Sequence, residues 1–226
     1  MQVKSEIREP LVKTGIKESA AKAIHYPFEK MADVLVWSGA DPNRITASKI
    51  PITLASLGVH QQHAVAGVAL FVAGSIVDVL DGKVARKTKK TSVEGAVLDA
   101  LVDKVVNAYM YLYIASQLDW KNLPQDQVLV FLMVLNASVD IVSQKMRGSL
   151  WKQVKDSARV VWDPSRVMLG ENSQKANTAG KIKAHLQCYG VVSALLAMNQ
   201  PAFQALALAL FSGSLLFAYK SIKGRS

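Results

Sequence analysis

The chain has 226 residues, of which 27 are Lys or Arg and 17 are Asp or Glu, so its formal net charge is +10. Half of the residues are apolar and gather into long uncharged stretches, which excludes a disordered chain and a coiled coil. The single cysteine, Cys188, cannot form an internal disulfide, so a disulfide-stabilised secreted module is excluded as well.

The first 40 residues form an N-terminal region of their own. Residues 15–38 interleave apolar side chains with lysines, which predicts helical segments that lie in the headgroup plane of a membrane. A solvated helix that packs on the rest of the protein is the alternative. We expect no signal peptide, because the first 30 residues hold no apolar run of the required length. The chain is therefore divided into an interfacial segment, 1–40, and a membrane domain, 41–226.

Long uncharged stretches predict membrane helices in the second region. Residues 50–77 carry no formal charge, and the polar residues 60–63 divide this stretch into two helices. Residues 184–219 are also uncharged; as one helix they would reach roughly 54 Å, whereas a bilayer core is about 30 Å thick, so a turn at 199–201 is expected. The two helices of the first stretch are predicted near 45–59 and 61–81, and two more helices are predicted near 93–117 and 126–144. The predicted fold class is an all-α integral membrane protein with six transmembrane helices.

The distribution of Lys and Arg predicts the orientation of these helices, because cytoplasmic loops carry the positive charge. Basic residues are dense before the first helix, in the loop 83–90, between 145 and 183, and at the end of the chain. The intervening turn 60–63 has none, and the loop after the third helix has only Lys121. Both termini and the basic loops are predicted to be cytoplasmic.

Four aspartates flank the basic loop between the second and third predicted helices. Asp78 and Asp81 are three residues apart, and Asp99 and Asp103 are four apart, so each pair projects from one helix face. Antiparallel helices bring the two faces together, and the natural compensation for their charge is a hard divalent cation. Oxygen ligands favour Mg²⁺ or Mn²⁺ over zinc. Because metal pairs held by carboxylates act on phosphate esters and anhydrides, phosphoryl chemistry is expected.

Small residues and an arginine accompany the aspartates. Gly82, where the second helix is expected to end, and Gly95 leave room for a bulky ligand or for a second backbone. The methyl side chain of Ala85 takes up little space beside such a ligand, and Arg86 can bind phosphate oxygens in a bidentate manner. These residues predict room for a bulky ligand that carries phosphate groups.

The complete motif, Asp-x2-Asp-Gly-x2-Ala-Arg-x8-Gly-x3-Asp-x3-Asp, resembles the signature of the CDP-alcohol phosphatidyltransferase family. All eight of its defined residues are present between Asp78 and Asp103. The family's upstream element, Pro-Asn-x2-Thr-x2-Arg, is matched by Pro42, Asn43 and Thr46, with Lys49 in the place of the arginine.

The resemblance implies an enzyme that transfers a phosphatidyl group from CDP-diacylglycerol to the hydroxyl of a small alcohol and releases CMP. It implies a homodimer in contact with membrane lipids, a cytoplasmic active site and no nucleic-acid partner. Asp103 would be the catalytic general base, which must reach the acceptor hydroxyl. The implied ligands of two Mg²⁺ or Mn²⁺ ions are Asp78, Asp81, Asp99 and Asp103. The implied CDP-lipid-binding residues are Asn43, Thr46, Asp78, Gly82, Ala85, Arg86 and Gly95.

A second segment bears on the acceptor. Residues 180–187 resemble the Gly-Lys-x-Lys-Thr-x2-Gln element of glycerophosphate-using enzymes, with Ala184 in the place of the threonine. Because an alcohol phosphate brings roughly two negative charges, Lys181, Lys183 and Arg147 are predicted to bind it. The expected acceptor is glycerol 3-phosphate; inositol phosphate and then phosphatidylglycerol, as in cardiolipin synthesis, are the alternatives.

Two hypotheses from other classes remain open. Acidic residues in membrane helices also mark ion pathways, so a cation transporter is one alternative, although transporters place such groups near the bilayer midplane. A non-catalytic membrane scaffold of the same fold is the other, and the complete set of aspartates argues against it. Asp140, inside the fourth predicted helix, matches no motif and is not assigned to the site.

Overall fold

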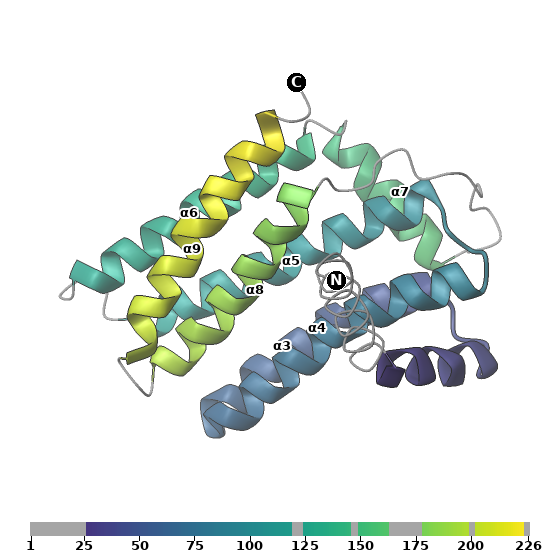
Figure 1. The fold of residues 1–226 in the computed structure, drawn as a ribbon, viewed down its shortest axis with the longest axis horizontal. Helices are drawn as coiled ribbons and strands as arrows, with labels where there is room; N and C mark the ends of the chain where they lie inside the picture. Colours follow the sequence, from purple (N-terminus) through teal and green to yellow (C-terminus); the bar gives the residue numbers. More distant parts are fainter. Residues whose placement is uncertain (1–25, 119–123, 146–148, 163–177, 199–201, 224–226) are drawn as a thin grey trace, which may run out of the picture.

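The computed structural model of this protein describes residues 26–118, 124–145, 149–162, 178–198 and 202–223. In these ranges the regular elements are helices, and no β-strand is present (Figure 1). The all-α prediction is therefore confirmed for the described part of the chain. A helix over residues 26–37 comes first. The others are α3 (Pro42–Gln62), α4 (Ala64–Lys87), α5 (Val93–Gln117), α6 (Pro124–Lys145), α7 (Leu150–Trp162), α8 (Thr178–Ala197) and α9 (Ala202–Lys223).

Side-chain caps fix the starts of the two helices that lead into the motifs. Asp41 accepts hydrogen bonds from the backbone N–H groups of Asn43 at 2.9 Å and Arg44 at 3.3 Å, and Pro42 opens α3. Ser92 Oγ accepts from the N–H of Gly95 at 2.9 Å and so caps α5. Both caps satisfy backbone donors that the first helical turn leaves free.

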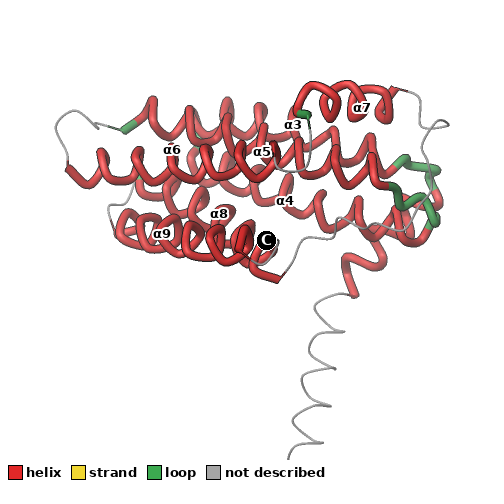
Figure 2. Tube along the Cα trace, turned by 90° about the horizontal axis from the view of Figure 1, so that it is seen from above, coloured by secondary structure: helices red, strands yellow, loops and turns green. Residues whose placement is uncertain are grey.

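The helices form a bundle that contains two antiparallel hairpins. α3 and α4 make one hairpin, α8 and α9 make another, and α5 lies between them (Figure 1). α7 packs across one end of α5, on the outside of the bundle (Figure 2). The main apolar core lies where these layers meet, and its largest fully buried members are Phe211, Met110, Ile114, Leu129 and Met133. Large apolar side chains also remain on the outer surface, such as Leu112 at 69% and Leu216 at 68% exposure.

Among the described residues, three helices are long and apolar enough to cross a membrane: α4, α6 and α9. α5 coincides with the predicted helix 93–117, and α3 and α6 extend the predicted 45–59 and 126–144 by a few residues at each end. The six-span count stays a prediction, and the predicted turn at 199–201 lies outside the described residues. One expectation is wrong: α4 does not end beside Gly82 but continues to Lys87, because its backbone hydrogen bonds run on to Thr88.

The helix over 26–37 is held to the last turns of α4 by ion pairs. Glu29 is paired with Lys83, and Lys87 Nζ lies 3.0 Å from Glu29 Oε2 and 2.5 Å from Asp33 Oδ1. The hydrogen bond from Lys83, followed by the one from Lys87, lowers the pKa of Glu29 from its ordinary 4.5 to about 2. Trp37 on the same helix is 89% exposed, so the described part of the protein does not cover this side chain.

Candidate active site

The first turns of α3 present the upstream motif to the rest of the site. Asn43, Thr46 and Lys49 are spaced three residues apart, so they share one face of the helix, and all three are buried. Thr46 Oγ1 donates to Asp81 Oδ2 at 2.6 Å, which links α3 to α4. Asn43 faces the start of α5, because its Oδ1 lies 3.0 Å from the position that a Cβ on Gly95 would take. The motif on α3 therefore contacts both of the helices that carry the aspartates.

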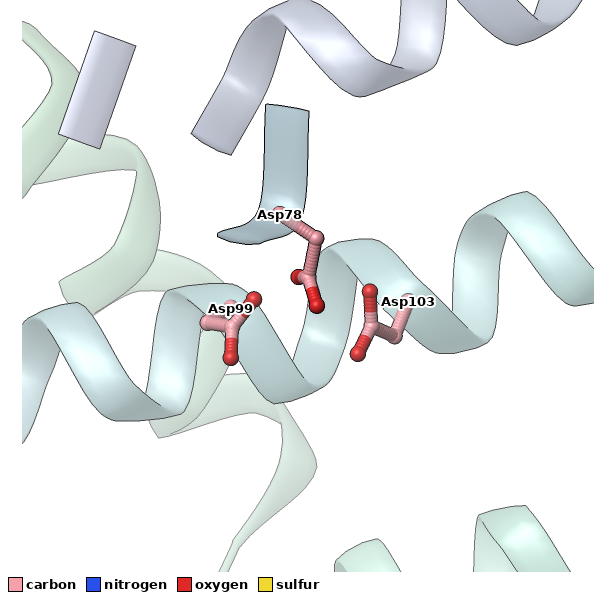
Figure 3. Close-up of side chains that lie close together, drawn as sticks. All are labelled: Asp78, Asp99 and Asp103. Atoms are coloured by element: carbon pink, nitrogen blue, oxygen red, sulfur yellow. The ribbon is translucent and has the colours of Figure 1, made fainter. Parts of the chain in front are cut away.

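Three aspartates converge beside this face (Figure 3). Asp99 and Asp103 project from successive turns of α5, and Asp78 reaches toward them from α4. One carboxylate oxygen from each lies within 4.8 Å of the other two. Their side chains are 41–44% exposed, so the cluster is open to a ligand from the solvent side. The structure thus brings together three of the four aspartates that the sequence predicts as metal ligands.

The fourth, Asp81, takes a different place. It is 6% exposed and accepts the hydrogen bond from Thr46, one turn of α4 beyond Asp78. It is not a member of the close set of three carboxylates. Asp81 therefore stands next to the cluster, oriented by α3.

Lys49 neutralises part of the charge of the cluster. Its ammonium nitrogen lies 2.5 Å from Asp78 Oδ1 and 3.4 Å from Asp99 Oδ1, and it also donates to Asp103 Oδ1. The side chain is only 6% exposed. The sequence places Lys49 in the position of the family's arginine but does not predict that it contacts the aspartates. The only indication of this contact in the sequence is the three-residue spacing of Lys49 from Thr46, which puts both on the same helix face.

The residues present fit a divalent cation. Three carboxylate oxygens lie close enough together to share one ion, and hard oxygen donors are the ligands that Mg²⁺ and Mn²⁺ prefer. The contact of all three carboxylates with one ammonium group shows that this position is suited to positive charge. Asp78, Asp99 and Asp103 would hold the ion, in competition with Lys49.

A cavity of about 580 Å³ opens beside the cluster. Asp78, Asp103 and Lys49 line one part of it, and side chains from α6 and α8 line another, including Asp140 and Lys183. Apolar residues such as Phe71 and Val192 complete the wall. The aspartates therefore face a space large enough for a small polar ligand, which the sequence alone does not reveal.

The residues predicted to bind the CDP-lipid lie at the same end of the bundle. Gly82 is covered by the guanidinium of Arg86, whose nearest nitrogen lies 3.5 Å from the position of an added Cβ. Arg86 is exposed and Ala85 is half-buried, so both are accessible beyond Asp81 on α4. Because α4 is helical here, these residues line a helix face and do not form a loop.

The structure separates the residues predicted to bind the acceptor. Lys183 is buried and lines the cavity. Lys181 is exposed, does not line the cavity, and its carbonyl oxygen contacts His185 Nδ1 at 2.7 Å. Arg147 lies outside the described residues. Of the two described lysines, Lys183 is the one that the structure brings to the aspartates' cavity.

Comparison with known proteins decides the family. The sequence profile described as CDP-alcohol phosphatidyltransferase matches residues 41–216, which include every residue of the site described above. The chain belongs to the CDP-alcohol phosphatidyltransferase family. The enzyme class predicted from the motif is thereby confirmed at the level of the family. Together with the three apolar helices, the family also supports the predicted location in a membrane.

A curated relative is similar over part of its length. The archaetidylinositol phosphate synthase of Pyrococcus horikoshii is 32% identical over 93 residues, which are 41% of this chain and 50% of the relative. The match thus spans about half of that protein. No solved structure matches the chain.

Proposed function

We propose that this member of the CDP-alcohol phosphatidyltransferase family transfers the lipid-bearing phosphate of a CDP-linked lipid to a hydroxyl of a small phosphorylated alcohol. A bond forms between the acceptor oxygen and the lipid phosphorus, the bond from that phosphorus to CMP breaks, and the hydroxyl proton passes to Asp103. The observation that carries the proposal is the cluster of Asp78, Asp99 and Asp103, which borders a cavity that Lys183 also lines.

The chain's own residues have distinct roles in this proposal. Asp78, Asp99 and Asp103 would hold Mg²⁺ or Mn²⁺, and Asp81 would add a further carboxylate for a second ion. Such ions would supply positive charge to offset that of the diphosphate and of the departing CMP. Thr46 keeps Asp81 oriented through its 2.6 Å hydrogen bond. Asp103, at the cavity wall, accepts the proton of the acceptor hydroxyl.

The donor lies at the end of the bundle where α3 and α5 begin and α4 ends. Arg86 donates hydrogen bonds to the diphosphate oxygens. The small residues Gly82, Ala85 and Gly95 leave room for the nucleotide. Asn43 adds a polar contact there, held close to Gly95. Acyl or isoprenoid chains lie along the apolar outer faces of the helices.

The acceptor is a phosphorylated polyol, with Lys183 as its cationic contact. The sequence favours glycerol 3-phosphate, but the Pyrococcus horikoshii relative is named an archaetidylinositol phosphate synthase, so inositol phosphate now comes first as the acceptor. Glycerol 3-phosphate is second and phosphatidylglycerol third. The excess of basic residues in alternate loops supports a cytoplasmic active site and cytoplasmic termini. A homodimer in a lipid membrane is the assembly that we propose.

Release of CMP tests the proposal. The purified full chain in detergent is incubated with Mg²⁺ or Mn²⁺, CDP-diacylglycerol or its ether-lipid counterpart, and one acceptor at a time: inositol phosphate, glycerol 3-phosphate, phosphatidylglycerol, or serine as the unphosphorylated control. We expect CMP only with metal and a phosphorylated acceptor. A cation transporter or a non-catalytic scaffold releases none under any of these conditions.

A further inference from the structure

A buried ion pair forms part of the cavity wall contributed by α6 and α8. Lys183 donates to Asp140 Oδ1, and the two side chains are only 10% and 7% exposed. Both residues line the cavity that Asp78 and Asp103 also line. The ion pair therefore borders the same space as the aspartate cluster, although nothing in the sequence motifs includes Asp140.

The carboxylate of Asp140 is held by further polar groups. Gln187, one turn beyond Lys183 on α8, donates to Asp140 Oδ2 at 3.1 Å and to Asn136 Oδ1 at 3.2 Å. Ser214 of α9 donates to the same Asn136 oxygen at 2.5 Å. These hydrogen bonds join three helices and fix the direction in which Asp140 meets Lys183.

Helix packing alone does not explain the charges. The neutral side chains Asn136, Gln187 and Ser214 already connect α6, α8 and α9. A buried ion pair adds little net stability to such a network, because the cost of desolvating both charges offsets most of their attraction. Charged groups in membrane helices are expensive and mostly serve a ligand. The ammonium group of Lys183 in the wall of this cavity therefore indicates a negatively charged ligand.

The ammonium group of Lys183 can serve such a ligand while it is paired. An ammonium has three N–H donors, and Asp140 Oδ1 accepts one of them. A lysine side chain has a long flexible stem that tends to extend toward water at the membrane surface. Asp140 opposes this movement by keeping the ammonium against the cavity.

We propose that Asp140 is a positioning residue: it holds the ammonium of Lys183 in the cavity, where that ammonium binds the phosphate group of the acceptor. The inference rests on the proposed function, since it concerns the acceptor of that reaction. It assigns to Asp140 no contact with the reacting atoms. Its effect on the acceptor is exerted through Lys183.

The substitution Asp140→Asn keeps the shape of the side chain and removes its charge. Binding of inositol phosphate and of glycerol 3-phosphate to the full chain in detergent is measured by thermal-shift titration, without CDP-lipid. Initial rates are then measured at saturating CDP-lipid. A hydrogen bond to a charged group contributes about 1.5–3 kcal/mol, so the acceptor Kd and KM should rise at least about tenfold. The kcat and the KM of the CDP-lipid should stay within about threefold of wild type.

Asp126 provides a matched control on the same helix. It is buried to 4% exposure, close to the 5% of Asp140, and it accepts a hydrogen bond from Gln204 of α9. It does not line the cavity. Asp126→Asn and Asp140→Asn should both lower the thermal midpoint, but Asp126→Asn should leave the acceptor Kd and KM unchanged. An equal rise in both variants would reduce Asp140 to a structural role and overturn the inference.

A double substitution tests whether Asp140 acts through Lys183. Lys183→Gln alone should raise the acceptor Kd, and adding Asp140→Asn should change it by less than about twofold. Effects that multiply, or an unchanged Kd in Asp140→Asn, would overturn the inference. If Asp140→Asn fails to fold, Asp140→Glu moves the carboxylate by one methylene and should still raise the acceptor Kd. An unchanged acceptor Kd in Asp140→Glu would also overturn the inference.

The binding and turnover measurements separate this inference from the proposed reaction. A wild-type protein that binds a phosphorylated alcohol but releases no CMP contradicts the reaction, while the comparison of Kd values still tests Asp140. A wild-type protein that turns over, with the same acceptor dependence in Asp140→Asn, contradicts only the role of Asp140. A wild-type protein that binds neither phosphorylated alcohol overturns both.

Discussion

The ammonium nitrogen of Lys49 lies 2.5 Å from Asp78 Oδ1, within the group of carboxylates that is suited to a divalent cation. Lys49 is nearly inaccessible, at 6% exposure, whereas Asp78 is 44% exposed. The lysine therefore approaches the carboxylates from the protein side and leaves their outer side open. When no metal is bound, the ammonium group of Lys49 offsets the electrostatic repulsion among the three carboxylates.

Replacing Lys49 with Gln should strengthen metal binding and weaken the metal-free protein. The substitution removes a positive charge at contact distance, an effect worth several kcal/mol at an intermediate dielectric constant. We expect the Kd for Mn²⁺, measured by electron paramagnetic resonance, to fall by at least about tenfold. The thermal midpoint in EDTA should also fall and recover with Mn²⁺. Lys90→Gln, at an exposed lysine outside the cluster, is the control, and equal Mn²⁺ affinity in both variants would refute the competition.

Asp103→Asn should remove turnover with little effect on donor binding. General-base catalysis contributes about 10²–10⁴-fold to rate, so CMP release should fall by at least about 100-fold. The Kd of the CDP-lipid, measured with the same detergent-solubilised protein, should change far less, since Asp78 and Asp99 remain. Asp156→Asn, on α7, is the control for a general effect of losing one carboxylate. A turnover within about tenfold of wild type would show that Asp103 is not the base.

Gly95→Ala should disturb the contact between α3 and α5. An added Cβ would lie 3.0 Å from both Asn43 Oδ1 and Ser92 Oγ, so both side chains must shift by a few tenths of an ångström. Overpacking of this kind costs about 1–3 kcal/mol, and we expect a lower thermal midpoint together with a raised KM for the CDP-lipid. Gly58→Ala is the matched control, because nothing lies within 4 Å of an added Cβ there. It should stabilise the helix by about 0.5–1 kcal/mol, and a destabilised Gly58→Ala would contradict the packing argument.

The ion pairs of Glu29 should make docking of the helix over 26–37 sensitive to acid. The pKa of Glu29 is lowered in the folded protein to about 2, from an ordinary 4.5. Its contribution is therefore fully present above about pH 5 and is lost as the pH falls toward 2. The difference in thermal midpoint between wild type and Glu29→Gln should shrink across this window. A difference that stays constant from pH 6 to pH 2 would show that the carboxylate charge does not hold the helix.

Much of the fold followed from uncharged stretches and turn residues. The limits of α5 agree with the predicted 93–117, and the cap that Ser92 provides explains why the helix begins there. The end of α4 was missed: Gly82 and the charged residues after it suggested a stop, but an isolated glycine does not end a helix whose next turn packs well. Val84 on that turn is fully buried against the helix over 26–37.

The site was predictable where a spacing pattern exists. Helical spacing places Asp99 and Asp103 on one face of α5, and Asp78 reaches them from α4; α4 and α5 come together because both pack on α3, not because they form a packed hairpin with each other. Two features were not predictable: the insertion of Lys49 among the aspartates and the pairing of Asp140 with Lys183. Both join residues on helices whose relative rotation is set by packing, which a single sequence does not specify.

The link between the helix over 26–37 and α3 is short and stiff. Gly39, with a φ of 74°, makes the turn, and Ala40 N–H donates to the Leu35 carbonyl, so residues 38–41 have little slack. If the helix over 26–37 lies on a membrane surface, as its sequence predicts, a tilt caused by a change in bilayer composition would be passed to the first turns of α3. Those turns orient Asp81 through Thr46. Catalytic rate in this enzyme should therefore depend on the lipids around it as well as on the lipid it consumes.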